Sequence, residues 1–183
     1  MNGEQATSYV LSKLEELKID HMLVGAFSSN AYGVIRSTND ADIVVAFGES
    51  DLTRLFKSLG EGFILDRQMM LEGFTGSVRN VIRHSESGFD IELFRLSNDP
   101  HHQERFARRR RIQINEFGRE AWIPAAEDVV IQKLRWARRK DLDDIVNVLI
   151  VSGKSLDWTY IYHWTDQHGT TALLDQLKSE VES

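Results

Sequence analysis

The most constraining feature of this sequence is a pair of aspartates, Asp40 and Asp42, at the start of an apolar run that continues to Phe47. The run alternates with the period of two that is typical of a β-strand, so both carboxylates project from the same face of the strand. The strand rise separates them by about 7 Å, and two like charges on one face repel each other. A divalent cation with oxygen ligands would relieve this repulsion, and we expect Mg²⁺ or Mn²⁺.

The segment before the aspartate pair has the pattern of an anion-binding turn. The apolar run at 21–24 predicts a buried strand, Gly25 follows it, and the next residues favour a short helix. Free backbone N–H groups at a helix N-terminus bind anions, and glycine has no Cβ to block their approach. Ser28 and Ser29 would add hydroxyl donors, and Arg36 would hold a phosphate through its guanidinium. The window predicts metal-assisted chemistry on a nucleoside triphosphate, although an isolated Asp-x-Asp pair more commonly caps a strand or helix in solvent.

This window resembles the signature of the nucleotidyltransferase superfold, the polymerase-beta-like family. That signature is a hydrophobic residue, glycine, then glycine or serine, a short spacer, and Asp-x-Asp or Asp-x-Glu. Arg36, Thr38, Asp40 and Asp42 resemble a bacterial branch that includes the nucleotidyltransferase toxins of abortive-infection toxin–antitoxin systems. The sequence departs from the signature at its second position, where Ala26 lacks a hydroxyl that could hold phosphate.

A second segment, residues 125–145, is similar to the Glu-Asp, Lys-Leu and Arg-Lys-Asp pattern of the same branch. The resemblance implies that Lys133 contacts the nucleotide phosphates and that Asp141 belongs to the catalytic set. Without the resemblance, these residue types would indicate a surface lysine and an aspartate that caps a helix. The two matching segments occur in the right order and together cover most of residues 20–150.

A third carboxylate is expected from the predicted strand at 89–95, which follows a strand at 77–84 and a turn at 85–88. Asp90 and Glu92 share one face of this strand, and its apolar residues share the other. The resemblance implies a third carboxylate on a strand beside the aspartate pair. We expect Asp90 in this position, with Glu92 as the second choice. It would complete the metal site and accept the proton of the attacking hydroxyl.

Composition limits the remaining classes. The 183 residues carry a net charge of −6 and suit one domain, or a domain with a helical extension. The absence of cysteine excludes disulfides, cysteine zinc sites and thiol catalysis. No apolar run approaches the roughly twenty residues needed to cross a bilayer, and the first residues lack a secretory signal pattern. We therefore expect a cytoplasmic protein with no membrane partner.

The densest positive patch comprises Arg105 and Arg108 to Arg111. It would suit the phosphate backbone of an RNA acceptor such as transfer RNA. A solvated helix end, or a surface for an acidic partner, explains the same residues equally well. The adjacent His101 and His102 are predicted to be loop residues and not zinc ligands, because no cysteine accompanies them.

Together these features predict an α/β (α+β) fold like that of nucleotidyltransferases. A mixed sheet with flanking helices would occupy residues 1–124, and a helical region over 125–183 would pack on it. The expected reaction moves a nucleoside monophosphate from a nucleoside triphosphate to RNA, protein or a small molecule. A toxin-like role with a cognate antitoxin, or a homodimer, would fit the resembling branch. The alternative is a catalytically degenerate binding or antitoxin module, which Ala26 supports.

Overall fold

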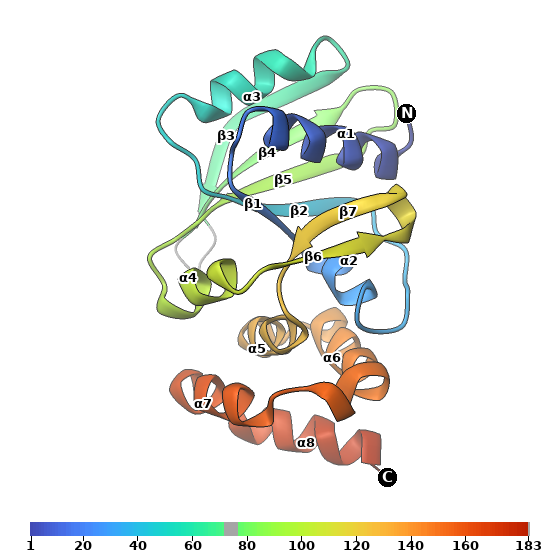
Figure 1. Ribbon diagram of the computed structural model, residues 1–183, viewed down its shortest axis with the longest axis vertical. Coiled ribbons are helices and arrows are strands. Elements are labelled where there is room, and N and C mark those ends of the chain that lie inside the picture. The colour runs from blue at the N-terminus through green and yellow to red at the C-terminus, as the bar shows by residue number, and fades with distance from the viewer. Residues whose placement is uncertain (72–76, 183) are drawn as a thin grey trace.

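The computed structural model describes residues 1–71 and 77–182, and it is built around a five-stranded mixed sheet (Figure 1). The strands lie in the order β1, β2, β5, β4, β3. Their bounds are β1 (His21–Val24), β2 (Asp40–Val45), β3 (Phe63–Leu71), β4 (Val78–His84) and β5 (Asp90–Arg95). Only β2 and β5 run parallel, and the other neighbouring pairs within this sheet are antiparallel. The mixed sheet with flanking helices confirms the fold class predicted from the sequence.

One face of the sheet is mainly apolar and lies against two helices. Alternate residues of the central strands, among them Leu23, Ile43 and Ile91, point to this face and are buried. Helices α1 (Gly3–Glu16) and α3 (Asp51–Leu59) cover it, and their buried leucines recur at helical spacing (Figure 1). Burial of these apolar side chains is the main contribution to the stability of this half of the chain.

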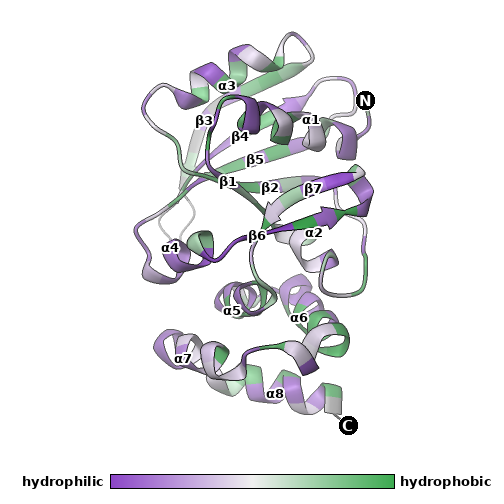
Figure 2. Ribbon diagram, viewed as in Figure 1, coloured by the Kyte–Doolittle hydropathy of each residue, from purple (hydrophilic) through white to green (hydrophobic). Residues whose placement is uncertain are grey.

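The opposite face is apolar at one end only. Met22, Val24 and Val44 form a small cluster there with Phe106 from α4 (Pro100–Ala107). Further along the same face the strands carry acidic side chains, so this part of the sheet is open to polar ligands. Figure 2 shows the contrast between the mainly hydrophobic central strands and the mixed surfaces of the helices.

Two short strands, β6 (Arg110–Ile114) and β7 (Arg119–Ile123), form a separate ribbon. The 3₁₀ turn η1 (Asn115–Phe117) joins them. Inward-facing residues of the ribbon, such as Ile123, enter the main core. The ribbon leads through Pro124 into the C-terminal helices.

The C-terminal helices enclose a second buried cluster. They are α5 (Ala126–Trp136), α6 (Arg139–Ser152), α7 (Trp158–His168) and α8 (Thr171–Glu182), with the turn η2 (Gly153–Ser155) after α6. Their apolar stripes meet around Leu134, Ile145 and Ile161. Tyr32 packs against both clusters, and its hydroxyl donates to the Pro124 carbonyl at 2.9 Å. Within the described part of the chain, no helix combines the length and apolar character needed to cross a membrane.

The prediction of a loop at His101 and His102 is wrong. Both residues lie in α4 and are buried. Asp99 caps this helix by accepting from the His102 N–H, and Pro100 occupies the first turn, where its missing N–H costs nothing. The cap and proline are helix-start signals, and they precede the two histidines directly in the sequence.

Candidate active site

A cavity of about 300 Å³ lies on the open face of the sheet, beside the junction of α5 and α6. It is lined by acidic, basic and aromatic side chains from β2, β4, β5, the end of α5 and the start of α6. The lining residues are Asp40, Asp42, Arg79, Glu92, Phe94, Trp136, Arg138 and Lys140. Three carboxylates therefore face three cationic groups within one hollow.

The pairing of β2 with β5 decides which carboxylates meet in this cavity. These parallel strands place Asp40 beside Asp90, and Asp42 beside Glu92, so all four side chains lie on one face. Glu92 lines the cavity together with Asp40 and Asp42. The Asp90 carboxylate instead binds Arg83 at 2.6 and 2.8 Å and is not among the side chains that line it. The geometry therefore favours Glu92, the second choice from the sequence, over Asp90.

Gly25 lies against the Asp42 carboxylate. Because β1 pairs with β2 so that Val24 faces Asp42, the residue after Val24 comes next to the aspartate. Gly25 has a φ of +64°, and a Cβ added to it would lie 2.1 Å from Asp42 Oδ2. Glycine is therefore required here both for the backbone conformation and for the space that the carboxylate occupies.

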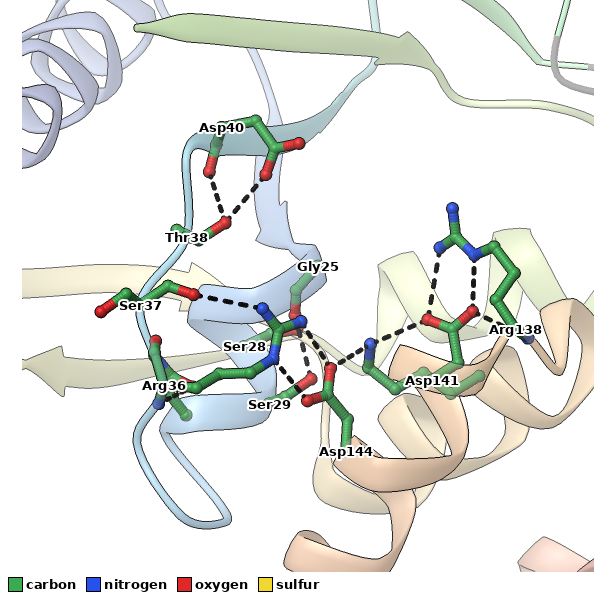
Figure 3. Close-up of polar contacts among 12 residues, drawn as sticks. Gly25, Ser28, Ser29, Arg36, Ser37, Thr38, Asp40, Arg138, Asp141 and Asp144 are labelled. Atoms are coloured by element: carbon green, nitrogen blue, oxygen red, sulfur yellow. Dashed lines mark hydrogen bonds and ion pairs between the residues drawn. The ribbon is translucent and has the colours of Figure 1, made fainter.

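The Asp42 carboxylate is in an environment that disfavours negative charge. Burial raises its pKa to about 7, with further contributions from the charges of Asp40 and Glu92, while Lys140 and Lys133 act in the opposite direction. A carboxylate of this kind is stabilised by a cation. Asp40 is oriented by Thr38, whose hydroxyl donates to Asp40 Oδ1 at 2.8 Å (Figure 3).

Ser28 and Ser29, expected to contact phosphate, lie inside α2 (Gly25–Asn30) and are buried. Both hydroxyls donate to the carbonyl oxygen of Gly25, at 2.9 and 3.0 Å (Figure 3). The structure does not bring them to the cavity, and their hydrogen bonds hold the first turn of this six-residue helix. Neither is placed to replace the hydroxyl that Ala26 lacks.

Arg36, Lys133 and Asp141 belong to one chain of ion pairs behind the cavity (Figure 3). Arg36 binds Asp144 through two hydrogen bonds of 2.7 and 2.9 Å. Lys133 Nζ lies 2.7 Å from Asp144 Oδ2 and 3.3 Å from Asp141 Oδ1. Asp141 in turn accepts from Arg138 Nε at 2.6 Å. The chain connects the loop after α2 with both α5 and α6.

Burial makes these charges dependent on one another. The side chains of Lys133, Asp141 and Asp144 are exposed by only 5%, 0% and 2%. Burial alone would raise the pKa of Asp144, but hydrogen bonds from Arg36 and Lys133 hold it below its ordinary value. Neither Lys133 nor Asp141 lines the cavity. Their ion pairs join α5 to α6, and Asp144 joins both helices to Arg36 in the loop before β2.

Two of the three cations that line the cavity, Arg138 and Lys140, come from the segment where α5 ends and α6 begins. Ala137 ends α5 in the left-handed conformation, with a φ of +48°, and the chain reverses there. Arg138 and Lys140 follow, and the Arg138 guanidinium lies 5.0 Å from the centre of the Trp136 ring. The signal for this feature was the basic run after α5, which resembles the positive charge that commonly ends a helix.

The arginine patch proposed for RNA is largely engaged with acidic and aromatic groups of this chain. Arg105 is buried in α4. Arg108 binds Asp128 at 3.1 Å and lies over the Tyr160 ring. Arg109 binds Asp20, Arg111 binds Glu15 and Glu120, and Arg110 is exposed on β6. These contacts give most of the patch a structural purpose.

The side chains that line the cavity fit a divalent cation. In the ranges 1–71 and 77–182, no group of three or more acidic or histidine side chains is already close enough to enclose an ion. The cavity nevertheless presents three carboxylates, and burial, together with the charges of the other two, raises the pKa of Asp42 to about 7. Carboxylate oxygens, completed by water and substrate phosphates, are the ligands that Mg²⁺ prefers.

No protein-family model matches this sequence, and the search of curated proteins found no match. Solved structures do match. A nucleotidyltransferase-like antigenic protein from Paracoccidioides brasiliensis is 20% identical, with a TM-score of 0.54 over 80% of this chain and 75% of its own. The lincosamide antibiotic adenylyltransferase LnuA, with lincomycin bound, is 14% identical, with a TM-score of 0.55 over 82% of this chain and 99% of its own.

A third match, ANT(2'')-Ia in complex with adenylyl-2''-tobramycin, is 14% identical, with a TM-score of 0.55 over 92% of this chain and 98% of its own. These proteins share with this chain the arrangement of the strands and flanking helices over most of its length. The identities are low, so what the comparison establishes is the architecture. The chain therefore has the nucleotidyltransferase fold, as its sequence resemblance implied.

Proposed function

We propose that this protein is a nucleotidyltransferase that depends on Mg²⁺ or Mn²⁺ and transfers a nucleoside monophosphate to an acceptor hydroxyl. The observation that carries the proposal is the cavity in which three carboxylates face Arg138 and Lys140. Pyrophosphate would be the leaving group. Such a reaction needs little covalent chemistry from the protein, because positioning and charge neutralisation provide most of the catalysis.

Each polar group in the cavity then has a defined task. Asp40, Asp42 and Glu92 would hold the metal, which would supply neutralisation of charge on the phosphoryl oxygens. Arg138 and Lys140 would bind the triphosphate, the first as a planar fork and the second as a point charge. Glu92 would also take the proton of the acceptor hydroxyl, through a carboxylate oxygen that the metal does not use.

Two observations bear on the acceptor. The structural matches include an adenylyltransferase of lincosamide antibiotics and a complex with adenylylated tobramycin, and both are small hydroxylated molecules. The arginine patch, the feature that favoured RNA, is largely paired within the chain. We therefore propose a small hydroxylated acceptor first. An RNA or protein acceptor, as in the toxin branch that the sequence resembles, is the second candidate because of the Arg36 to Asp42 motif.

Transfer of label from α-labelled nucleoside triphosphates tests the proposal. The protein is incubated with Mg²⁺ and, separately, an aminoglycoside, a lincosamide, transfer RNA or a protein extract. We expect transfer to one acceptor class, and loss of that transfer in Asp42→Asn. Calorimetry with ATP and Mg²⁺ gives an independent reading. Absence of both transfer and Mg²⁺-dependent binding would show the degenerate module that Ala26 supports.

A further inference from the structure

One of the three cavity carboxylates is already bound to an arginine. Arg79 on β4 donates from Nη1 to Glu92 Oε2 on β5 at 2.7 Å, and both side chains line the cavity. Their side chains are exposed by 26% and 18%, so the pair is partly shielded from water. The Arg79 guanidinium also lies 5.9 Å from the centre of the Phe94 ring and 3.1 Å from Met70 Sδ.

This ion pair bears on the third metal ligand. A carboxylate that holds a guanidinium already has its compensating charge, so a cation must displace the guanidinium or bind beside it. Consistent with this, the described residues contain no acidic group of three that is arranged to hold an ion, although Asp40, Asp42 and Glu92 line one cavity. The third carboxylate of the site, Glu92, is thus already paired with Arg79.

A triphosphate would give Arg79 another partner without requiring it to leave the cavity. Guanidinium groups bind phosphate oxygens through two parallel hydrogen bonds, and a triphosphate carries more negative charge than one carboxylate. We infer that Arg79 exchanges between Glu92 and the nucleotide phosphates, so that Glu92 becomes available to the metal only when the nucleotide is present. This inference rests on the proposed function and makes Arg79 a positioning residue that couples the binding of nucleotide and metal.

The same two strands supply a matched control. Arg83 and Asp90 form a second arginine–carboxylate pair on β4 and β5, with Arg83 Nε 2.6 Å from Asp90 Oδ1. The side chains of this pair are exposed by 58% and 31%, and neither lines the cavity. Replacing Arg83 removes the same kind of group from the same sheet face without touching Glu92.

The experiment measures Mn²⁺ affinity in the nucleotide-free protein from the electron paramagnetic resonance signal of the free ion. We expect Arg79→Gln to bind Mn²⁺ at least about tenfold more tightly than the wild type, a typical size for coupling between two sites. Arg83→Gln should stay within about twofold of the wild type, since exposed ion pairs contribute little. Arg79→Lys, which keeps a cation but loses the fork, should lie between Arg79→Gln and the wild type.

Loss of a positive charge near any acidic cavity could by itself attract Mn²⁺, so two further variants isolate the exchange. Lys140→Gln removes a cavity cation for which no contact with Glu92 is seen, and it should raise affinity less than Arg79→Gln does. In a Glu92→Gln background, Arg79→Gln should give no larger gain than Lys140→Gln. A gain from Arg79→Gln that is undiminished without Glu92, or no gain at all, would overturn the inference.

Calorimetry with ATP and Mg²⁺ separates this inference from the proposed function. If the wild type binds ATP with Mg²⁺ while Arg79→Gln shows wild-type Mn²⁺ affinity, the exchange is refuted and the proposed function stands. If neither the wild type nor any variant binds ATP, both fail together. Thermal unfolding of each variant establishes that the protein measured is folded.

Discussion

Replacing Gly25 by alanine should remove activity without a matching loss of stability. Alanine in the left-handed region costs about 1–2 kcal/mol of backbone strain, which in a chain of this size lowers Tm by about 2–8 °C. The added Cβ would also lie 2.1 Å from Asp42 Oδ2, whereas ordinary contact begins near 3.4 Å. The carboxylate must therefore move by more than 1 Å. Because Oδ2 is at the flexible end of the side chain, and Asp42 Cγ and Cβ at 3.0 and 3.1 Å need shift only slightly, this movement adds little to the loss of stability.

The two effects can be separated with a second glycine. Gly118 also has a positive φ, +63°, but a Cβ added there meets nothing within 4 Å. Gly118→Ala should therefore show a similar fall in Tm and retain nucleotidyl transfer. Gly25→Ala should lose about 100-fold in kcat/KM, the effect expected when a reacting group is misplaced by about 1 Å. Equal activity in the two variants would refute the claim that the position of Asp42 controls the chemistry.

Three further outcomes test other parts of the structure. In a labelled-ATP assay, Glu92→Gln should reduce nucleotidyl transfer by about 100-fold, whereas Asp90→Asn should leave it nearly unchanged. A larger loss in Asp90→Asn than in Glu92→Gln would show that Asp90, the first choice from the sequence, is the third carboxylate. Asp144→Ala should lower the free energy of urea unfolding by roughly 3 kcal/mol, because it removes one of the two carboxylates that pair with the buried Lys133. A decrease below about 1 kcal/mol would contradict the claim that these ion pairs stabilise the fold. Burial, helped by the neighbouring Arg105, lowers the pKa of His102 to about 3. Between pH 6.5 and 4 the unfolded chain therefore binds a proton at His102 that the native state does not, and the free energy of unfolding should fall by about 3 kcal/mol. Urea titrations at each pH should show a smaller fall for His102→Gln.

The aspartate pair and the strand that carries it could be predicted because the evidence is local. Alternation fixes the shared face of Asp40 and Asp42 within three residues of sequence. The helices that cover the other sheet face were equally predictable from apolar spacing, as in the stripe of α1. These features need no knowledge of which strand pairs with which.

The choice between Asp90 and Glu92 could not be made from sequence. Both lie on the same strand face, and the pairing of β2 with β5 sets each beside an aspartate of β2. They differ in that Glu92 lines the cavity, whereas Asp90 is bound to Arg83 outside it. That register joins residues about fifty positions apart, and the limits of the cavity depend further on where α6 begins. Neither the strand register nor the position of α6 against the sheet can be predicted from the local sequence.

Asp144 was a partner that the sequence could have disclosed. It follows Asp141 by three residues on α6, so both carboxylates lie on one helix face, toward Lys133 and Arg36. A motif comparison draws attention to Lys133 and Asp141 as matching positions, but it does not say what they contact. The structure shows that the two form an ion pair with each other, and that Lys133 also binds Asp144.

The structure gives Gly25 a different role from the one that its sequence position indicates. Read along the chain, a glycine between a strand and a helix indicates an approach for phosphate. In the sheet, the Asp42 carboxylate occupies the space that a Cβ at position 25 would need, because β1 and β2 set Val24 opposite Asp42. The residue that marks the family signature therefore acts on the proposed metal ligand directly. Arg138, on the other side of the cavity, is bound to Asp141 through Nε at 2.6 Å. An alanine at position 25 would therefore change the distance between Asp42 and a cation that has a partner of its own.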